Sequence, residues 1–297
     1  MAFLDAIGVP HVLSKSMFGS HLSIAGGLHN ALLEAEQLGC ETVQVFTKNQ
    51  QQWKCKPLEQ EAIDNWQSHC RRLKFKRTVS HDSYLINLAS PDPALRARSI
   101  ELFIDELARC VVLGIPYLVT HPGAHMGDGE EAGLRRVAAA LDQVHDAAPA
   151  DGVITCLEIT AGQGSSLGYR LEHLAAIIST VKAPQRLGVC LDTAHLFAAG
   201  YDFRGRKYAA FRKHLGKTVG MSRVKVLHLN DSKKDLGSRV DRHEHIGRGK
   251  IGLEGFRPFL RDNAFARIPK ILETEKGKDD RGRSWDAVNL EVLRSLV

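Results

Sequence analysis

The sequence predicts an α/β protein of the TIM (β/α)8 barrel class, with eight parallel strands inside a ring of helices. The first observation is a repeated pattern: an apolar or β-branched run, a loop, and a segment with apolar residues at three-to-four spacing. The second is that this pattern recurs eight times along the chain. The third is the length of 297 residues, which fits one barrel of about 250 residues with short extensions.

Eight short runs are the expected strands of the barrel. Each is apolar or β-branched, as strands buried in a parallel sheet usually are. In chain order they span residues 18–24, 42–48, 77–82, 117–123, 153–159, 187–192, 224–231 and 269–274. Because a helix-period segment separates each from the next, they predict a closed parallel sheet.

Eight amphipathic segments are the expected outer helices. They span residues 28–39, 58–73, 100–114, 134–148, 169–181, 210–220, 253–262 and 285–296. Gly39 and Gly114 stand where the first and third should end, and Pro57 precedes the second. No linker or change in composition marks a second domain. We therefore expect one domain over residues 1–297, with residues 1–17 as a loose N-terminal extension.

The composition is typical of a soluble globular protein, with 43% hydrophobic and 25% charged residues. A formal charge of +6 is compatible with a phosphate-rich partner without requiring one. The six cysteines form no CxxC pair, which favours reduced thiols in a cytoplasmic protein over a thiolate zinc site. No run approaches the roughly 20 apolar residues of a membrane span.

Six consecutive strands are expected to end in a residue that can bind a metal. These residues are His81, His121, Glu158, Asp192, His228 and Glu273. Active sites of this fold gather at the C-terminal ends of the strands. One such histidine would more often be structural, but six residues of ligand type at one rim indicate a metal site.

Three loop residues extend this set to nine. His195 follows Asp192 by three residues, so a helical turn would place both on one side. Asp241 and His243 are two apart and share a face in an extended segment. Nine ligands suit three ions, or two with supporting residues, since one catalytic zinc takes about three. Imidazole and carboxylate fit Zn²⁺, with Mn²⁺ or Fe²⁺ as alternatives in one position.

Such a cluster suits phosphodiester hydrolysis. Ions about 3.5–4 Å apart lower the pKa of a shared water and stabilise both the attacking and the leaving oxygen. Glu158 lies in the middle of the series and is the expected bridging and catalytic residue. His21 and His125 lie on the same rim and are expected to support the ligands. The other histidines, His11, His29, His69, His145, His173, His214 and His245, are expected to face solvent.

Several motifs resemble those of the endonuclease IV family of abasic-site nucleases. They are HDSYLINL, HPG, E-x-T-A-G-Q-G-S, DTAH with FAAGYD, HLNDSK, SRVDRHEHIG and LET. They occur in the family's order between about residue 19 and about residue 275. The resemblance implies a TIM barrel with three zinc ions that hydrolyses the phosphodiester 5′ to abasic sites in duplex DNA. The products implied are a 3′-hydroxyl and a 5′-deoxyribose phosphate, and 3′-blocked ends would also be trimmed.

The resemblance also implies how the nine ligands are shared. The first ion would be held by His81, His121 and Glu158, the second by Glu158, Asp192, His228 and Glu273, and the third by His195, Asp241 and His243. Tyr84 and Leu85 match family residues that enter the minor groove at the lesion. Duplex DNA is the implied partner, and no obligate protein partner is expected.

Some positions depart from the family pattern. Gln51 stands where a positively charged wedge is usual, Ile159 where Asn is common, Glu275 where Pro is usual, and Ala194 where Cys is frequent. Basic residues on the rim loops are expected to contact phosphates. They are Lys48, Lys54, Lys233, Lys234, Arg239, Arg242, Arg248, Lys250, Lys276, Lys278, Arg281 and Arg283.

Two other functions remain open from the residues alone. A sugar isomerase or epimerase on the same barrel would need only Glu158, Asp192, His228 and Glu273. A non-catalytic protein that binds damaged DNA would keep the fold without needing the ligands. The five further ligands and the basic loops favour the nuclease over both.

Overall fold

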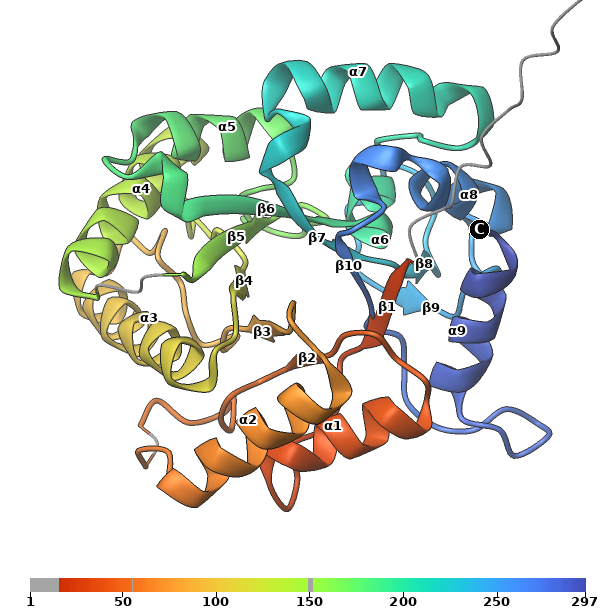
Figure 1. The fold of residues 1–297 in the computed structure, drawn as a ribbon. Helices are drawn as coiled ribbons and strands as arrows, with labels where there is room; N and C mark the ends of the chain where they lie inside the picture. The colour runs from red at the N-terminus through yellow and green to blue at the C-terminus, as the bar shows by residue number, and fades with distance from the viewer. Residues whose placement is uncertain (1–15, 55, 149–151) are drawn as a thin grey trace, which may run out of the picture.

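The computed structural model describes residues 16–54, 56–148 and 152–297 and confirms the predicted barrel (Figure 1). Its strands are β1 (Met17–Ser20), β2 (Gln44–Val45), β3 (Val79–His81), β4 (Tyr117–Thr120), β5 (Ile154–Glu158), β6 (Leu187–Asp192), β7 (Val224–His228) and β10 (Pro269–Leu272). All eight lie within the predicted runs, apart from Met17 at the start of β1. Neighbours pair in parallel in the order β1-β10-β7-β6-β5-β4-β3-β2.

The barrel closes between β1 and β2 through a short seam. There, one isolated parallel bridge joins His21 to Gln44. The Leu22 N–H donates to the Gln44 carbonyl at 2.9 Å, and the Glu41 N–H donates to the Phe18 carbonyl at 2.8 Å. The other neighbouring strands share regular ladders, so this seam is the sparsest pairing of the ring.

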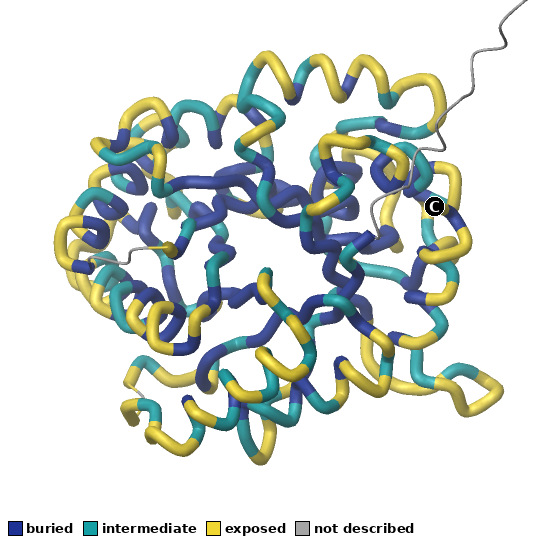
Figure 2. The backbone as a smooth tube through the Cα atoms, viewed as in Figure 1, coloured by how far each residue is buried: buried dark blue, intermediate teal, exposed yellow. Residues whose placement is uncertain are grey.

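Helices surround the strands and turn their exposed faces outward (Figure 2). They are α1 (Leu28–Gln37), α2 (Gln60–Leu73), α3 (Pro93–Leu113), α4 (Glu130–Ala147), α5 (Leu171–Thr180), α6 (Thr193–Ala198), α7 (Tyr208–Thr218), α8 (Leu253–Arg261) and α9 (Trp285–Ser295), with 3-10 turns η1 (Pro184–Arg186), η2 (Gly205–Lys207), η3 (Met221–Arg223) and η4 (Asn263–Phe265). Among the described residues, no helix has the length and apolar character needed to cross a bilayer.

Five of the eight predicted helices, α2, α3, α4, α5 and α7, begin two to seven residues away from the expected start. Helix α3 begins seven residues earlier than expected, at Pro93, because the Asp92 carboxylate caps it by accepting from Ala94 and Leu95, and proline fits its first turn. Helix α2 begins at Gln60, two residues after the expected start, and lacks a side-chain cap.

A small hairpin was not predicted. Strands β8 (Asp231–Ser232) and β9 (His243–Glu244) pair in antiparallel fashion and form a sheet separate from the barrel. The Asp231 carboxylate accepts from the backbone N–H groups of Gly247, Gly249 and Ile251 at 2.9–3.0 Å and so holds the following loop.

A layer of apolar side chains lies beneath the strand ends. It is a separate buried cluster formed by Val79, Val119, Cys156, Cys190, Val226 and Ile271. Each lies two residues before one of the six strand-end ligand candidates, so both members of each pair share a strand face. The barrel interior is therefore packed below and polar at the rim, as expected for this fold.

The predicted N-terminal extension lies mostly outside the described residues, which start at Ser16. Met17 is not part of an extension, because it belongs to β1 and pairs with Pro269.

Candidate metal centre

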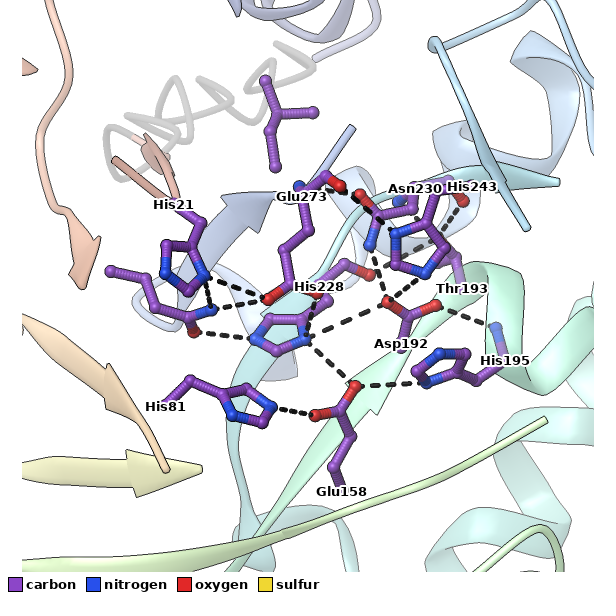
Figure 3. A network of polar contacts seen from close by, with 12 residues as sticks. His21, His81, Glu158, Asp192, Thr193, His195, His228, Asn230, His243 and Glu273 are labelled. Atoms are coloured by element: carbon purple, nitrogen blue, oxygen red, sulfur yellow. Dashed lines mark hydrogen bonds and ion pairs between the residues drawn. The ribbon is translucent and has the colours of Figure 1, made fainter. Parts of the chain in front are cut away.

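All nine candidate ligands come together at the C-terminal rim of the barrel, and we refer to them as the ligand ring. Its members are His81, His121, Glu158, Asp192, His195, His228, Asp241, His243 and Glu273. Strand ends supply six of them, helix α6 supplies His195, and the hairpin supplies His243 with Asp241 just before it. Figure 3 shows the labelled members converging on Glu158 and Asp192.

The first group joins β3, β4 and β5. The Glu158 Oε2 atom lies 3.1 Å from His81 Nε2 and 3.4 Å from His121 Nε2. One ligand atom from each of the three residues lies within 4.8 Å of the others, so they could hold a metal ion.

The second group joins β5, β6, β7 and β10. Its centre is His228 Nδ1, which lies 3.1 Å from Glu158 Oε1 and 3.0 Å from Glu273 Oε2. Asp192 Oδ2 is 3.9 Å from the same nitrogen. These four residues also satisfy the distances expected for ligands of one ion.

The third group joins helix α6 to the hairpin. Asp192 caps α6 by accepting from the His195 N–H at 2.8 Å, which is the helical turn that the DTAH spacing required. His195 Nε2 and His243 Nε2 lie 3.1 and 3.4 Å from the Asp241 carboxylate. His243 Nε2 is also 3.6 Å from Asp192, so Asp192 links the second and third groups.

The electrostatics of the ligand ring favour bound cations. Burial opposes the charge on Glu158, yet His228 and His121 outweigh it and hold the carboxyl pKa well below its ordinary value. Burial likewise opposes the charge on His195, but Asp192 and Asp241 raise the pKa of its imidazole well above the ordinary value. Among the residues that the structure describes, the buried Nε2 of His243 has no hydrogen-bond partner. The donor set therefore fits metal ions.

Cys190 lies within reach of Glu158 and His228 but is a poor ligand. Burial raises the pKa of its thiol to about 12, and metals bind the thiolate rather than the thiol. The described cysteines, Cys40, Cys70, Cys110, Cys156 and Cys190, are all free, as the sequence predicted.

Two supporting residues escaped the sequence reasoning. Gln44 contacts His21, His228 and Glu273 at 2.9, 2.8 and 2.6 Å. Asn230 donates to Asp192 Oδ2 at 2.6 Å and accepts from the Glu273 N–H at 2.8 Å. The available signal was a polar residue inside an apolar strand for Gln44, and a position two residues after a ligand for Asn230.

The two predicted supporting histidines differ in their surroundings. His21 Nδ1 lies 3.5 Å from the Glu273 carboxylate, beside the ligand ring. His125 Nδ1 accepts from the Gly129 N–H at 3.1 Å and so supports the loop before α4. A direct role at the metals remains a prediction for His125.

Two hollows flank the ligand ring, and Tyr84 lines both. One of about 820 Å³ also contains His21, Gln51 and Leu85. The other, of about 510 Å³, also contains His195, Asp241 and Arg242. Tyr84 is 67% exposed, so its ring is available to a macromolecule that covers this rim.

The residues that were expected to contact phosphates differ in their exposure to solvent. Lys233, Arg239 and Arg242 are exposed. Lys233 Nζ lies 3.5 Å from Glu275, so this carboxylate has a basic partner. The Arg239 guanidinium lies over the ring of Tyr169 at 4.4 Å. Lys48 departs from the expectation, because it is buried and its Nζ atom lies 3.5 Å from Glu106.

The expectation of solvent-facing histidines was wrong for His145, His173 and His245, which are buried. His11 lies outside the described residues. Ile159 is fully buried, and its main-chain carbonyl accepts from His195 Nδ1 at 2.9 Å. Its side chain therefore provides packing, and the backbone provides the polar contact. Ala194 is buried as expected for a packing change.

Known proteins resemble this chain in sequence and fold. A family described as xylose isomerase-like TIM barrel matches residues 32–296. A probable endonuclease 4 of Chloroflexus aurantiacus is 50% identical over 281 residues, which cover 94% of this chain and 98% of that protein. The crystal structure of endonuclease IV from Thermus thermophilus matches with a TM-score of 0.83 and 35% identity, covering 94% of this chain and 98% of that one.

Sugar epimerases share the architecture at lower similarity. A D-tagatose 3-epimerase-like protein matches with a TM-score of 0.72 and 20% identity, covering 94% of this chain and 96% of that one. Identity at this level shows a common fold and leaves the chemistry to be argued from the ligand ring.

Proposed function

Since this chain belongs to the endonuclease IV proteins of the xylose isomerase-like TIM barrel family, we propose that the ligand ring holds the metal ions of its nuclease activity. The chain is a DNA-repair hydrolase that acts on DNA. The proposed reaction is hydrolysis of the phosphodiester 5′ to an abasic site in duplex DNA. It leaves a 3′-hydroxyl and a 5′-deoxyribose phosphate, and trimming of 3′-blocked ends is a second proposed activity.

One observation carries the metal assignment: the Glu158 carboxylate lies within 3.4 Å of nitrogen atoms from His81, His121, His195 and His228. These four histidines come from all three groups. A carboxylate has two oxygens to share, so Glu158 is placed to bridge two ions. Three Zn²⁺ ions are proposed, with Mn²⁺ or Fe²⁺ as an alternative in one position.

Some residues of the site would bind the metal ions, and others would position those ligands. When bound, the ions would supply an activated water and neutralise charge on the phosphate. Asn230 and the Ile159 carbonyl orient Asp192 and His195, as supporting residues of metal sites usually do. Tyr84 and Leu85 stand over the hollow beside His21, where they would enter the minor groove at the lesion. Gln51 would act there by shape and hydrogen bonding, without a charge.

The sugar isomerase alternative uses only the second group of ligands. It leaves His81, His121, His195, Asp241 and His243 without a purpose. Yet His81 and His121 group with Glu158, and His195 and His243 lie beside Asp192 and Asp241. A non-catalytic binder would not require any of the nine. A cytoplasmic location and independence from an obligate protein partner stay predictions.

The deciding experiment combines metal analysis with a nicking assay on a duplex that contains one abasic site. We expect about three metal ions per chain and a product with a 3′-hydroxyl beside a 5′-deoxyribose phosphate. An intact duplex without the lesion is the control substrate. Binding without nicking by the fully metal-loaded protein would exclude the nuclease proposal, and one ion per chain with ketose–aldose activity would establish the sugar isomerase.

A further inference from the structure

We propose that Gln44 is a positioning residue of the metal centre, whose carboxamide fixes the ring tautomers of His228 and His21 and orients Glu273. This inference rests on the proposed metal-binding role of the ligand ring. Gln44 is fully buried in β2, a strand that supplies no ligand.

The carboxamide of Gln44 is held by three partners from three other segments of the barrel. Its Nε2 atom lies 2.6 Å from Glu273 Oε1 and 2.9 Å from His21 Nδ1. Its Oε1 atom lies 2.8 Å from His228 Nε2. Figure 3 shows His21 beside His228 and Glu273, two members of the ligand ring.

The chemistry of these partners determines the orientation of the amide. Gln44 Nε2 faces the Glu273 carboxylate at 2.6 Å, and Gln44 Oε1 faces His228 Nε2 at 2.8 Å. A carboxylate that binds a metal ion only accepts hydrogen bonds. The atom facing Glu273 must therefore be the amide nitrogen. The oxygen then faces His228, so the His228 Nε2 atom must carry the hydrogen of that bond.

This assignment leaves His228 Nδ1 to act as the ligand atom. With the proton of the neutral ring held on Nε2, the lone pair belongs to Nδ1, which lies 3.0–3.1 Å from Glu158 and Glu273. The Gln44 side chain thus orients two ligands of the second group, because it donates to Glu273 and accepts from His228. Metal-bound histidines commonly have their second ring nitrogen held in this way.

The second amide hydrogen defines the state of His21. At 2.9 Å, Gln44 Nε2 is closer to His21 Nδ1 than Glu273 is, at 3.5 Å. A ring nitrogen that accepts from an amide carries no proton, so the proton of His21 lies on Nε2. His21 and Gln44 are also the two residues of the bridge that closes the barrel. One side chain therefore couples barrel closure to the geometry of the second metal group.

Two substitutions separate the donor and acceptor roles. Gln44→Met keeps the volume but removes both, and should raise the rate of zinc loss to a chelator by about 10- to 100-fold, the usual effect of losing such a partner. Gln44→Glu keeps an acceptor for His228 but places a second carboxylate against Glu273, so zinc loss should accelerate while the His228 tautomer is retained. Gln67→Met is the matched control, because Gln67 lies on α2 and its amide donates to the Val112 carbonyl.

Nitrogen-15 NMR of the histidine rings in the zinc-loaded wild-type protein tests the same proposal without a substitution. We expect a proton on Nε2 and metal on Nδ1 for His228, and a proton on Nε2 for His21. Metal on Nε2 of His228, or zinc loss from Gln44→Met within about twofold of the Gln67→Met rate, would overturn the proposal. Wild-type nicking is measured in parallel, so an inactive wild type counts against the endonuclease reaction while the zinc and NMR results still decide the role of Gln44.

Discussion

Glu158 combines two properties that rarely occur together in one carboxylate. It is almost completely buried, which alone would favour the neutral acid. Four imidazoles surround it within hydrogen-bonding or ion-pair distance. The site is therefore built to keep a negative charge at its centre, which is the requirement for holding two cations close together.

Glu158→Gln should retain the fold and most DNA binding but lose cleavage by about 100-fold or more, because a neutral amide cannot bridge two ions and metal assistance is worth several kcal/mol. The measurement is nicking of an abasic duplex together with binding to the same duplex. Turnover close to wild type would overturn the role assigned to Glu158.

His145 should make stability depend on pH. Burial, aided by Arg186, lowers the pKa of this imidazole from 6.5 to about 4, and neither ring nitrogen has a hydrogen-bond partner within the described part of the chain. The unfolded chain therefore binds this proton more tightly than the folded protein does. The contribution of the neutral imidazole to the free energy of unfolding is complete above pH 6.5 and is lost as the pH falls towards 4. His145→Leu should flatten the dependence, as measured by urea unfolding from pH 7.5 to pH 5. An equal change of the free energy of unfolding with pH in the wild type and in His145→Leu would contradict this prediction.

At the scale of elements, buried polar contacts hold the start of the loop after β2 in place. Lys48 Nζ lies 3.5 Å from Glu106 on α3 and donates to the Gln52 carbonyl at 3.2 Å. Thr47 donates to the same glutamate at 2.9 Å. Gln51 is therefore carried on a segment whose base is fixed by buried polar contacts.

Lys48→Met should lower the free energy of unfolding by about 3 kcal/mol, because removing one partner leaves a buried carboxyl group uncompensated. Adding Glu106→Gln should recover part of this loss, since the second group is then neutral. Chemical unfolding of both variants in the same metal state measures the coupling. Strictly additive losses would show that the pair does not act as a unit.

The sequence allowed the barrel and the ligands to be predicted because both depend on local patterns. Strand ends are marked by apolar runs, and a ligand such as His228 follows directly from its position at one of them. The start of α3 was missed because Asp92 and Pro93 lie in a segment without apolar periodicity. Lys48 was misjudged because its role depends on Glu106, which lies far away along the chain. Gln44 was missed for the same reason, since its partners include the distant His228.

At the scale of the whole molecule, the positions of the basic residues matter more than the modest net charge of +6. Exposed basic residues such as Lys233, Arg239 and Arg242 lie on the same rim as the ligand ring. Since phosphate contacts release counterions, the affinity for duplex DNA should fall steeply as salt rises.

Arg242→Gln should reduce the slope of log affinity against log salt by about 1, as expected for the loss of one phosphate contact. Lys182→Gln is the control, because Lys182 pairs with Asp146 and lies between α5 and β6, at the end of the barrel opposite the rim. A titration of duplex binding at several salt concentrations measures both slopes. Equal slopes for the two variants would remove Arg242 from the DNA interface.

The seam between β1 and β2 joins the two sides of the site through few backbone bonds. Every ligand of the ring lies from β3 onward along the chain, whereas the larger hollow is lined by the loops after β1, β2 and β3 together with Lys276. The two residues of the seam bridge contact both sides, because His21 lines the hollow and Gln44 contacts Glu273 and His228. The bridge that closes the barrel is therefore a direct structural link between the surface proposed to receive DNA and the second ligand group.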